Sequence, residues 1–349
     1  MRVDVEESLR GHRDAWDRLV AAQRLPSPFL ASWWVENAAA GRPRLVLCSV
    51  DGELVGGAAF EADRVGRGPV GVERVRMLGQ GELAPDHLDV VAAPGHEDAV
   101  TDRVVGWLRG PGSRVVDLDG LAADGRLAGR LARSVIDRSV APWADLSDGA
   151  EAYLAGRPGK VRSTVSRSRK RLEKAGCTLR EVTADRAEEA LADLARLHDG
   201  RWGDDSGFLG AWRTFATAAA AGLADGGVRA VELVGPDGVV AATEWDLVVG
   251  GRWCFYQAGR STDHDLRGAG SVVKAEVITR AAAEGASEYD LLRGDEPYKA
   301  DWATGRRPLV RVRFGVGALG RPTVLAATAW RTLRTRIDER RGDREVTAP

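Results

Sequence analysis

The two halves of the chain repeat one arrangement of strands and turns. Residues 44–63 and residues 229–248 each read as a strand, an Asp-Gly turn and a returning strand rich in small residues, which is the pattern of a β-hairpin. The turns at Asp51 and Asp237 lie 186 positions apart (237 minus 51). A repeat of this length predicts a fold made of two copies of one unit.

A second match supports the duplication. Residues 97–120 and residues 271–294 each read as a helix, a glycine-containing turn and a strand that ends in glycine. The final glycines lie 174 positions apart (294 minus 120), so the loops differ in length between the copies. At 349 residues the chain is also long enough for two domains.

The second copy predicts a complete unit of strands and helices. We expect, in order, a strand at 177–183, helices at 186–199 and 208–222, strands at 228–234, 239–249 and 252–259, a helix at 270–285, a strand at 287–292, a helical turn at 296–303 and a strand at 309–315. The predicted domains are 1–138, 139–321, and a basic C-terminal helix and tail at 322–349.

The composition is that of a soluble, globular protein. The formal net charge of -1 excludes a globally basic nucleic-acid binder, though not a local basic patch, and we expect no DNA partner. The N-terminus lacks a signal sequence and no apolar run is long enough to cross a bilayer, so we expect a cytoplasmic protein without integral membrane association. Widely separated cysteines predict reduced, buried thiols rather than disulfides or a zinc site; they are Cys48, Cys177 and Cys254.

Four blocks of the sequence resemble a known family. They are, in order, KVRSTVSRSRKRLEKAG (160–176), LHDGRW (197–202), FYQAG (255–259) and YDLLRGDEPYKADW (289–302). They resemble the successive blocks of the FemAB and CelD-like branch of the GNAT acyltransferase superfamily, and the resemblance covers most of the chain. It implies an α/β (α+β) fold with two tandem GNAT-like domains, each a mixed, mostly antiparallel central sheet flanked by helices, of which the first is degenerate.

Residues 157–176 predict an amphipathic helix with a dense cationic face. Val161, Val165 and Leu172 fall on one side, and only Glu173 balances the cations. Such a run is often a solvated face, but neighbouring like charges repel one another unless an anion relieves them. The anion would be a CoA phosphate, an anionic acceptor or tRNA, and the candidate substrate-binding residues here are Arg162 and Arg169.

The loop at 259–273 predicts an anion site, because the first N–H groups and the dipole of a helix favour negative charge. The resemblance implies acyl-CoA here, yet the superfamily motif needs a small residue at Val272, and a plain helix cap is the alternative. Asp263, His264 and Asp265 lack a distant fourth ligand, so we expect no metal. The cofactor-binding candidates are Gln257, Ala258, Gly259, Arg267, Gly268, Ala269, Gly270 and Ser271.

Two further segments carry candidate bases. His198 has a side chain that titrates near neutral pH, although its position four residues after Leu194 also fits a buried histidine. Glu244 and Asp246 share one face of a predicted strand, which is either the cleft face or a polar outer face. The acceptor-binding candidates beside them are Arg201, Trp202 and Tyr256.

The block at 289–302 places polar and aromatic residues directly after a strand, where ligands bind in open α/β sheets. Its acids and its proline suit the first turn of a helix and can simply cap it. That explanation leaves out Arg293. Helical spacing predicts one shared surface for Asp295, Tyr298, Lys299 and Trp302.

The expected activity is direct N-acyl transfer from acyl-CoA, most simply acetyl-CoA, to an amine of a small or envelope-related acceptor. Backbone N–H groups near Gln257 would polarise the thioester carbonyl. A carboxylate would take the proton of the amine, and a tyrosine would protonate the leaving thiolate. The residues expected to transfer protons or to steady negative charge are Glu244, Glu296, Tyr256, Tyr298, Lys299 and Arg293.

Two other functions stay open. A Fem-like enzyme would take an aminoacyl group from tRNA, using the basic helix on the RNA backbone, and its donor binding would depend strongly on salt. A non-catalytic binding protein would have two degenerate copies. Only the second copy carries the Glu-Pro-Tyr-Lys segment, so the chemistry is expected there.

Overall fold

The computed structural model describes residues 1–66, 71–202 and 207–326. These residues form one 13-stranded sheet, in the order β1-β2-β3-β4-β6-β13-β7-β12-β11-β10-β9-β8, with β5 beside β3. Its strands are β1 (Arg2–Glu6), β2 (Arg42–Val50), β3 (Glu53–Val65), β4 (Val72–Met77), β5 (Val91–Ala92), β6 (Arg114–Ala122), β7 (Val135–Asp145), β8 (Thr178–Glu181), β9 (Val228–Val234), β10 (Val240–Val249), β11 (Arg252–Arg260), β12 (Glu288–Asp290) and β13 (Gly305–Val316).

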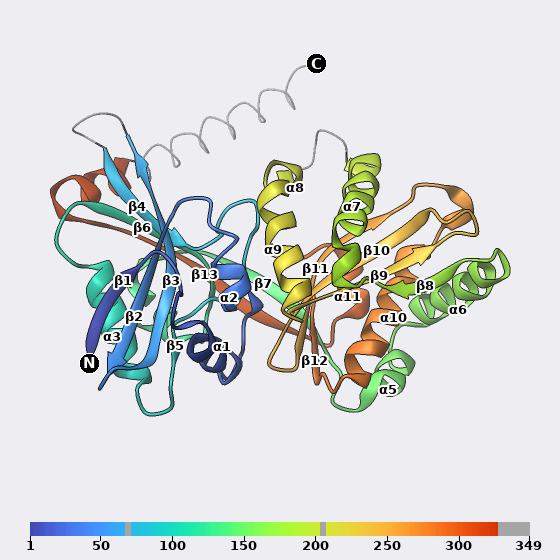
Figure 1. The fold of residues 1–349 in the computed structure, drawn as a ribbon, viewed down its shortest axis with the longest axis horizontal. Coiled ribbons are helices and arrows are strands. Elements are labelled where there is room, and N and C mark those ends of the chain that lie inside the picture. Colours follow the sequence, from blue (N-terminus) through green and yellow to red (C-terminus); the bar gives the residue numbers. More distant parts are fainter. Residues whose placement is uncertain (67–70, 203–206, 327–349) are drawn as a thin grey trace, which may run out of the picture.

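Helices flank both faces of this sheet, and the molecule has two lobes joined by the long strands β7 and β13 (Figure 1). The helices of the first lobe are α1 (Arg13–Ala21), α2 (Ser32–Val35), α3 (Glu97–Leu108) and α4 (Arg126–Arg130). Those of the second lobe are α5 (Gly149–Ala155), α6 (Gly159–Lys174), α7 (Ala187–Trp202), α8 (Gly207–Gly210), α9 (Trp212–Ala224), α10 (Ala269–Ala283) and α11 (Pro297–Trp302).

Both halves have the same topology, which confirms the duplication. In the first unit β2, β3 and β4 form an antiparallel meander, α3 follows, and β6 returns parallel to β4. In the second unit β9, β10 and β11 form the meander, α10 follows, and β12 returns parallel to β11. The sheet of the described residues is mixed and mostly antiparallel, as expected.

The last strands of the two units are exchanged. β7, at the end of the first unit, pairs with β12 of the second. β13, at the end of the second unit, lies between β6 of the first unit and β7. The predicted domain boundary at residue 138 falls inside β7. Each unit therefore needs the other to complete its sheet.

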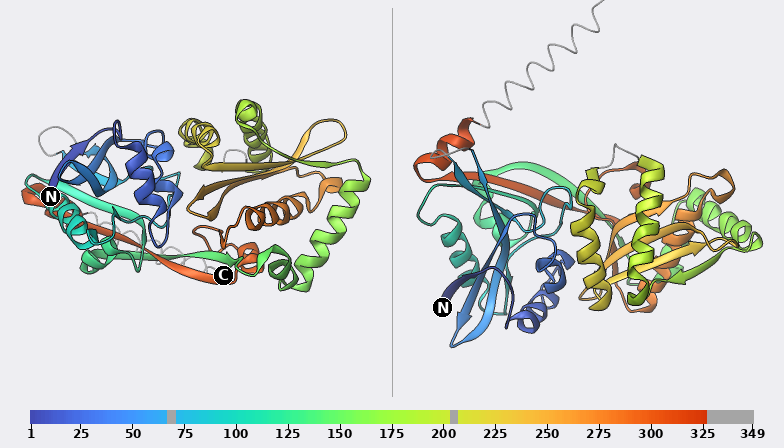
Figure 2. Two further views of the ribbon diagram at one scale, coloured as in Figure 1. Left: turned by 60° about the horizontal axis from the view of Figure 1, so that its bottom comes forward. Right: turned by 45° about the horizontal axis from the view of Figure 1, so that its top comes forward.

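The two units also share a core. One hydrophobic cluster combines residues of the first unit with the face of the second unit that α7 and α9 cover. Aromatic rings bridge the units, because Tyr256 of β11 packs edge-on against Phe29 and Trp34 and beside Phe215 of α9. A separate cluster fills the opposite face, between the sheet and α5, α6 and α10. Figure 2 shows α7 and α9 on one side of the second unit's strands and α10 on the other.

Several predicted boundaries shift. β12 is shorter than expected, and β13 begins at Gly305 rather than at residue 309 because it pairs with β7 from that residue onward. A helix runs from residue 317 to residue 326, so it begins before Pro322; the rest of the predicted C-terminal helix and tail lies outside the described residues. All three cysteines are free and buried, as predicted. Within the described ranges no helix is both long and apolar enough to span a bilayer.

Candidate active site

The second unit has an opening in its sheet between β11 and β12. The two strands pair only from Arg252 to Cys254, whose last partner is Asp290. β11 continues to Arg260 along β10, while the chain after β12 turns away at Leu292, which has a positive φ of 56°. The edge of β11 from residue 255 to residue 260 thus faces this opening rather than a neighbouring strand, and its backbone groups can bind a ligand.

A β-bulge lies at this edge. The register between β10 and β11 shifts so that Trp245 is opposite Gln257 and Asp246 is opposite Phe255, which leaves Tyr256 as the extra residue. Bulges redirect side chains and backbone groups and are common beside active sites. Here the bulge directs Tyr256 into the contact with the first unit, where its hydroxyl donates to the Leu83 carbonyl at 2.8 Å. Burial raises the pKa of Tyr256 well above its ordinary value.

Gln257, Ala258 and Gly259 lie on β11 immediately after the bulge. A side chain at Gly259 would meet the Leu197 Cβ at 2.6 Å, so the glycine lets α7 pack closely on the strand. Gly259 thus has a role in packing, in addition to its predicted role in binding the acyl donor.

Cations surround the start of α10. Gly268 precedes the helix with a φ of 85°, and a side chain there would collide with Ser168 of α6. Arg171 of α6 donates to the Arg267 carbonyl, and the aliphatic part of Arg260 lies beside Gly270. The first turn of α10 contains no acid. Ala269, Gly270 and Ser271 form this turn. The Ser271 N–H donates to the Gly268 carbonyl at 3.1 Å, whereas the N–H groups of Ala269 and Gly270 have no partner within the helix, so the site suits a phosphate.

Glu244 is enclosed in a polar cluster beneath β11. Its side chain is 2% exposed and accepts from Lys274 of α10 at 3.0 Å and from the Tyr289 hydroxyl at 2.5 Å. The same hydroxyl lies 2.8 Å from Asp246, which confirms that Glu244 and Asp246 share a face. Lys274 also lies over the Phe255 ring, 3.4 Å from its centroid.

The cluster carries two acids and one lysine in a buried site, and this imbalance changes the proton affinity of its members. Burial, together with the neighbouring charge of Glu244, raises the pKa of Asp246 well above its ordinary value. Burial and the two acids likewise raise the pKa of Tyr289. The arrangement favours a proton shared within the cluster over two full negative charges.

Arg293 binds the first unit. Its side chain donates to Asp86 at 2.5 Å, to Asp119 at 3.0 Å and to the Pro85 carbonyl at 2.7 Å, and its backbone N–H donates to Asp86 at 2.6 Å. Asp119 and Arg293 are equivalent positions of the two copies (119 plus 174 is 293). Arg293 therefore fastens the units together at the mouth of the opening.

The segment after Arg293 does not form the single surface predicted for it. α11 is a short helix that begins at Pro297, so Asp295 lies before it. The residue at the N-cap, Glu296, makes no side-chain hydrogen bond to the helix. Trp302 is buried in the second unit's core, and Lys299, 5% exposed, donates to the carbonyls of Leu292 and Arg293.

The exposed polar residues of the segment are Asp295, Glu296 and Tyr298. Tyr298 is 43% exposed, and Asp295 is exposed as well. Glu296, with a side chain 54% exposed, lies 3.1 Å from Lys299. An exposed carboxylate beside a buried lysine is the part of this segment that can meet a substrate.

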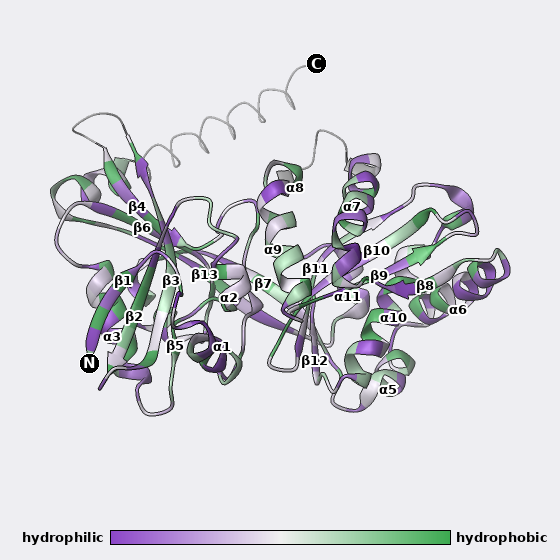
Figure 3. Ribbon diagram, in the orientation of Figure 1, coloured by the Kyte–Doolittle hydropathy of each residue, from purple (hydrophilic) through white to green (hydrophobic). Residues whose placement is uncertain are grey.

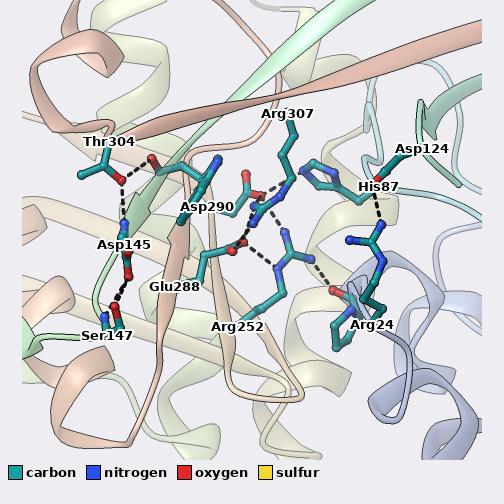
Figure 4. A network of polar contacts seen from close by, with 12 residues as sticks. Arg24, His87, Asp124, Asp145, Ser147, Arg252, Glu288, Asp290, Thr304 and Arg307 are labelled. Atoms are coloured by element: carbon teal, nitrogen blue, oxygen red, sulfur yellow. Dashed lines mark hydrogen bonds and ion pairs between the residues drawn. The ribbon is translucent and has the colours of Figure 1, made fainter.

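A polar network joins the units beside β12 (Figure 4). Arg252 binds both Glu288 at 2.9 Å and Asp290 at 2.6 Å, and it also donates to the Pro26 carbonyl of the first unit. His87 of the first unit lies 3.0 Å from Asp290. Although burial alone raises the pKa of Asp290, the charges of His87 and Arg252 hold it below its usual range.

The remaining predicted residues lie on α6, on α7 and in the loop before α10. His198 is buried with its ring tilted against Phe208, at a centroid distance of 5.1 Å. Arg201 and Trp202 end α7, and their side chains lie outside the described part. Arg162 is exposed, and Arg169 pairs with Glu276 of α10 at 3.3 Å.

The acids of the loop before α10 have a local structural role. Asp263 accepts from the backbone of Asp265 at 2.9 Å and so caps a short turn. In the described residues no group of three or more His, Cys, Asp or Glu side chains is placed to hold a metal.

Three residues at the site were missed by the sequence reasoning. Lys274 was not among the predicted site residues, yet it balances the buried Glu244. Arg260 of β11 and Arg171 of α6 come from different elements, and each contacts the segment at the start of α10. A lysine flanked by apolar residues on both sides, as in 272-VVKA-275, was the available signal for the first of them.

Comparison with known proteins gives a family match within the second unit. Residues 159–300 match the family model described as an acetyltransferase (GNAT) domain. No curated protein has a matching sequence.

Solved structures share the fold of most of the chain. A crystal structure of FemX matches with a TM-score of 0.62 and 12% identity, over 89% of this chain and 97% of that one. A conserved protein of unknown function from Bacteroides thetaiotaomicron matches with a TM-score of 0.61 and 11% identity, over 88% and 99%. A third match is the C-terminal domain of an Agrobacterium fabrum protein that carries the name lysylphosphatidylglycerol synthetase. It has a TM-score of 0.57 and 14% identity, over 88% of this chain and 92% of that one. At these identities the likeness is one of fold.

Proposed function

We propose that this chain, which shares its fold with FemX, is an acyltransferase of the GNAT superfamily and that its second unit moves an acyl group from acyl-CoA to an amine. Acetyl-CoA is the simplest donor. The acceptor is a small or envelope-related amine. The reaction is a direct attack on the thioester, which needs the two reactants held together, a proton acceptor and donors for the developing oxyanion.

The proposal rests on one observation. The sheet is open beside the unpaired edge of β11, and this opening leads to the N-terminus of α10, whose first turn contains no acid. The edge of β11 after Cys254 offers backbone N–H groups to the thioester carbonyl. At the start of α10, the helix dipole and the cations Arg171, Arg260 and Arg267 suit the CoA pyrophosphate. Val272 is buried beneath the sheet, so it leaves that turn open.

Glu296 is the carboxylate that we propose as the base. Glu244, the other predicted candidate, is shut inside its cluster with Lys274. Glu296 is exposed and stands beside Lys299, which suits a group that must exchange protons with a bound amine or a water. Tyr298, the exposed neighbour on α11, is then the candidate to protonate the leaving thiolate.

A second donor is also supported by an observation. FemX and the named synthetase share this fold, and the cations of α6 suit the backbone of a tRNA. In that case the aminoacyl ester would take the place of the thioester in the same opening. The three buried free cysteines fit a reducing compartment, so we place either reaction in the cytoplasm.

Thermal unfolding with different donors tests the proposal. The purified chain is heated alone, with acetyl-CoA, with longer acyl-CoAs and with an aminoacyl-tRNA, each at the same free concentration. A ligand at a hundred times its Kd adds about 2.7 kcal/mol to the folded state, so we expect a clear rise of Tm with acetyl-CoA. Stabilisation by the tRNA alone would assign the second donor, and stabilisation by none of them would contradict both.

A further inference from the structure

A second cavity lies away from the opening. It has a volume of about 500 Å³ and lies between α5, α6 and α10, with Leu154, Val161 and Val165 among its apolar lining residues. Arg162 and Thr279 also line it. Thr279 is near the C-terminal end of α10, whereas the proposed CoA site is at the N-terminal end. The cavity therefore belongs to a different surface.

The charged residues that line this cavity are Glu151, Arg157 and Arg162, and Lys160 lies close to Arg162 in the sequence. Lys160 and Arg162 stand in the first turn of α6, which contains no acid and has no side-chain cap. Cations at a helix N-terminus oppose the dipole, so an anion bound there would relieve an unfavourable arrangement. Among the described residues neither side chain has a hydrogen-bond or ion-pair partner, and both are exposed.

Further cations continue along the outer side of α6. Lys170 and Lys174 are exposed, and the acids on this side are few: Glu173 on the helix and Glu151 at the cavity. α6 lies at the outer end of the second lobe (Figure 1), and hydrophilic residues alternate with hydrophobic ones along its ribbon (Figure 3). A protruding helix of this kind can rest on a flat surface without obstruction from the rest of the molecule.

We propose that the α5–α6 end of the molecule docks on an anionic lipid bilayer, with one acyl chain entering the cavity and lipid phosphates bound by Lys160, Arg162 and the outer cations of α6. An apolar cavity beside unpaired cations matches the two chemistries of an anionic lipid. A single-stranded RNA fits this surface less well, because its recognition relies largely on bases stacking against exposed aromatic rings. The single aromatic residue of α5 and α6, Tyr153, is buried.

Vesicle co-sedimentation of the full chain tests this docking. Wild-type protein is mixed with phosphatidylglycerol–phosphatidylcholine vesicles and, separately, with pure phosphatidylcholine vesicles at 0.1 M salt, about the ionic strength at which charges more than 10 Å apart are screened. We expect binding to the anionic vesicles only. The double variant K160E/R162E should bind them at least about tenfold more weakly, because each cation near an anionic surface contributes about a factor of five.

Two further variants separate charge from cavity. The control R133E/R138E makes the same change of charge at exposed positions of the first lobe, and it should bind like the wild type. Val165→Asn keeps every charge but places an amide in the cavity, and it should weaken binding about threefold or more. Circular dichroism and the Tm of each variant show that it is folded.

Four results would overturn the proposal. They are equal binding to both kinds of vesicle, equal loss in the two charge-reversed variants, unchanged binding in Val165→Asn, and no vesicle binding by a wild-type chain that binds tRNA. Docking is measured without any acyl donor or acceptor, so its failure leaves the proposed acyl transfer untouched.

Discussion

The two units have one topology, but they differ where the parallel strands separate. In the first unit the ladder of β4 and β6 ends at Val75 and Val116. Beyond it the Gln80 side chain accepts from the backbone N–H groups of Met77, at 3.2 Å, and Asp119, at 3.0 Å. In the second unit the ladder ends at the equivalent pair, Cys254 and Asp290. The first opening is closed by a glutamine, and the second is available to a ligand.

The helices that follow the two meanders, α3 and α10, differ in the charge of their first turns. α3 of the first unit begins with Glu97 and Asp98, which compensate the helix dipole and repel an anion. α10 begins without acids and with arginines nearby. A fold common to both units thus supports an anion site in only one of them, and we propose that the first unit serves as the structural partner.

The buried strand faces differ too. Counted from each Asp-Gly turn, Glu244 and Asp246 of β10 correspond to Ala58 and Phe60 of β3 (58 plus 186 is 244), and both of the latter are buried. The first unit fills this place with apolar side chains, whereas the second maintains charges there. Buried charges that an apolar core could replace often have a role other than stability.

The largest expected effect comes from removing the side chain of Arg293, which pairs with Asp86 and with its equivalent position, Asp119. Arg293→Ala removes the guanidinium that pairs with the buried Asp86 carboxylate, so we expect a loss of about 3–5 kcal/mol in the free energy of unfolding. Urea denaturation measures it. Arg133→Ala, which removes an exposed arginine, should cost under about 0.5 kcal/mol. A loss below about 1 kcal/mol in Arg293→Ala would show that this contact does not hold the units together.

A second change makes α10 resemble α3. Ser271→Glu places an acid in the first turn of α10, which should stabilise the helix slightly but weaken acetyl-CoA binding about tenfold or more through repulsion of the pyrophosphate. Calorimetric titration measures the Kd. The control, Glu97→Gln in α3, should leave it unchanged. Equal binding by Ser271→Glu and the wild type would remove the proposed phosphate site.

A third change removes the side chain that closes the opening between β4 and β6 in the first unit. Gln80→Ala leaves the N–H groups of Met77 and Asp119 without their acceptor, and we expect it to cost about 1–3 kcal/mol. It should add no second acetyl-CoA site, since α3 still begins with acids. Both outcomes are checked by urea denaturation and by the binding stoichiometry. Two molecules of acetyl-CoA bound per chain would show that Gln80 alone keeps the first unit inactive.

The smallest effect concerns Asp246. Burial and Glu244 raise its pKa. Above the ordinary pKa of an aspartate, the folded state therefore binds more protons than the unfolded state. The free energy of unfolding should fall as the pH rises from about 4. Asp246→Asn carries no such proton. It should change stability by less than about 1 kcal/mol at pH 4, and the decline toward pH 8 should be shallower. Parallel stability curves for the two proteins would contradict a raised pKa.

The sequence by itself determined the duplication, the order of strands and helices in the second unit, the three buried thiols and the two sides of α6. These follow from local rules: Asp-Gly turns favour hairpins, and the spacing of apolar residues reports which side of a helix is buried. The resemblance of four short blocks named the superfamily. None of these signals requires contacts between distant parts of the chain.

Only the tertiary structure decided which residues meet. The exchange of β7 and β13, the binding of Arg293 by Asp86 and Asp119, the turning of Tyr256 into the contact between units, and the burial of Lys274 against Glu244 all join residues far apart in sequence. In a sequence, an arginine, a tyrosine or a lysine looks the same whether its side chain faces a ligand or another part of the chain. Periodicity fixes the direction of a side chain from its own element, but its partner depends on how the elements pack.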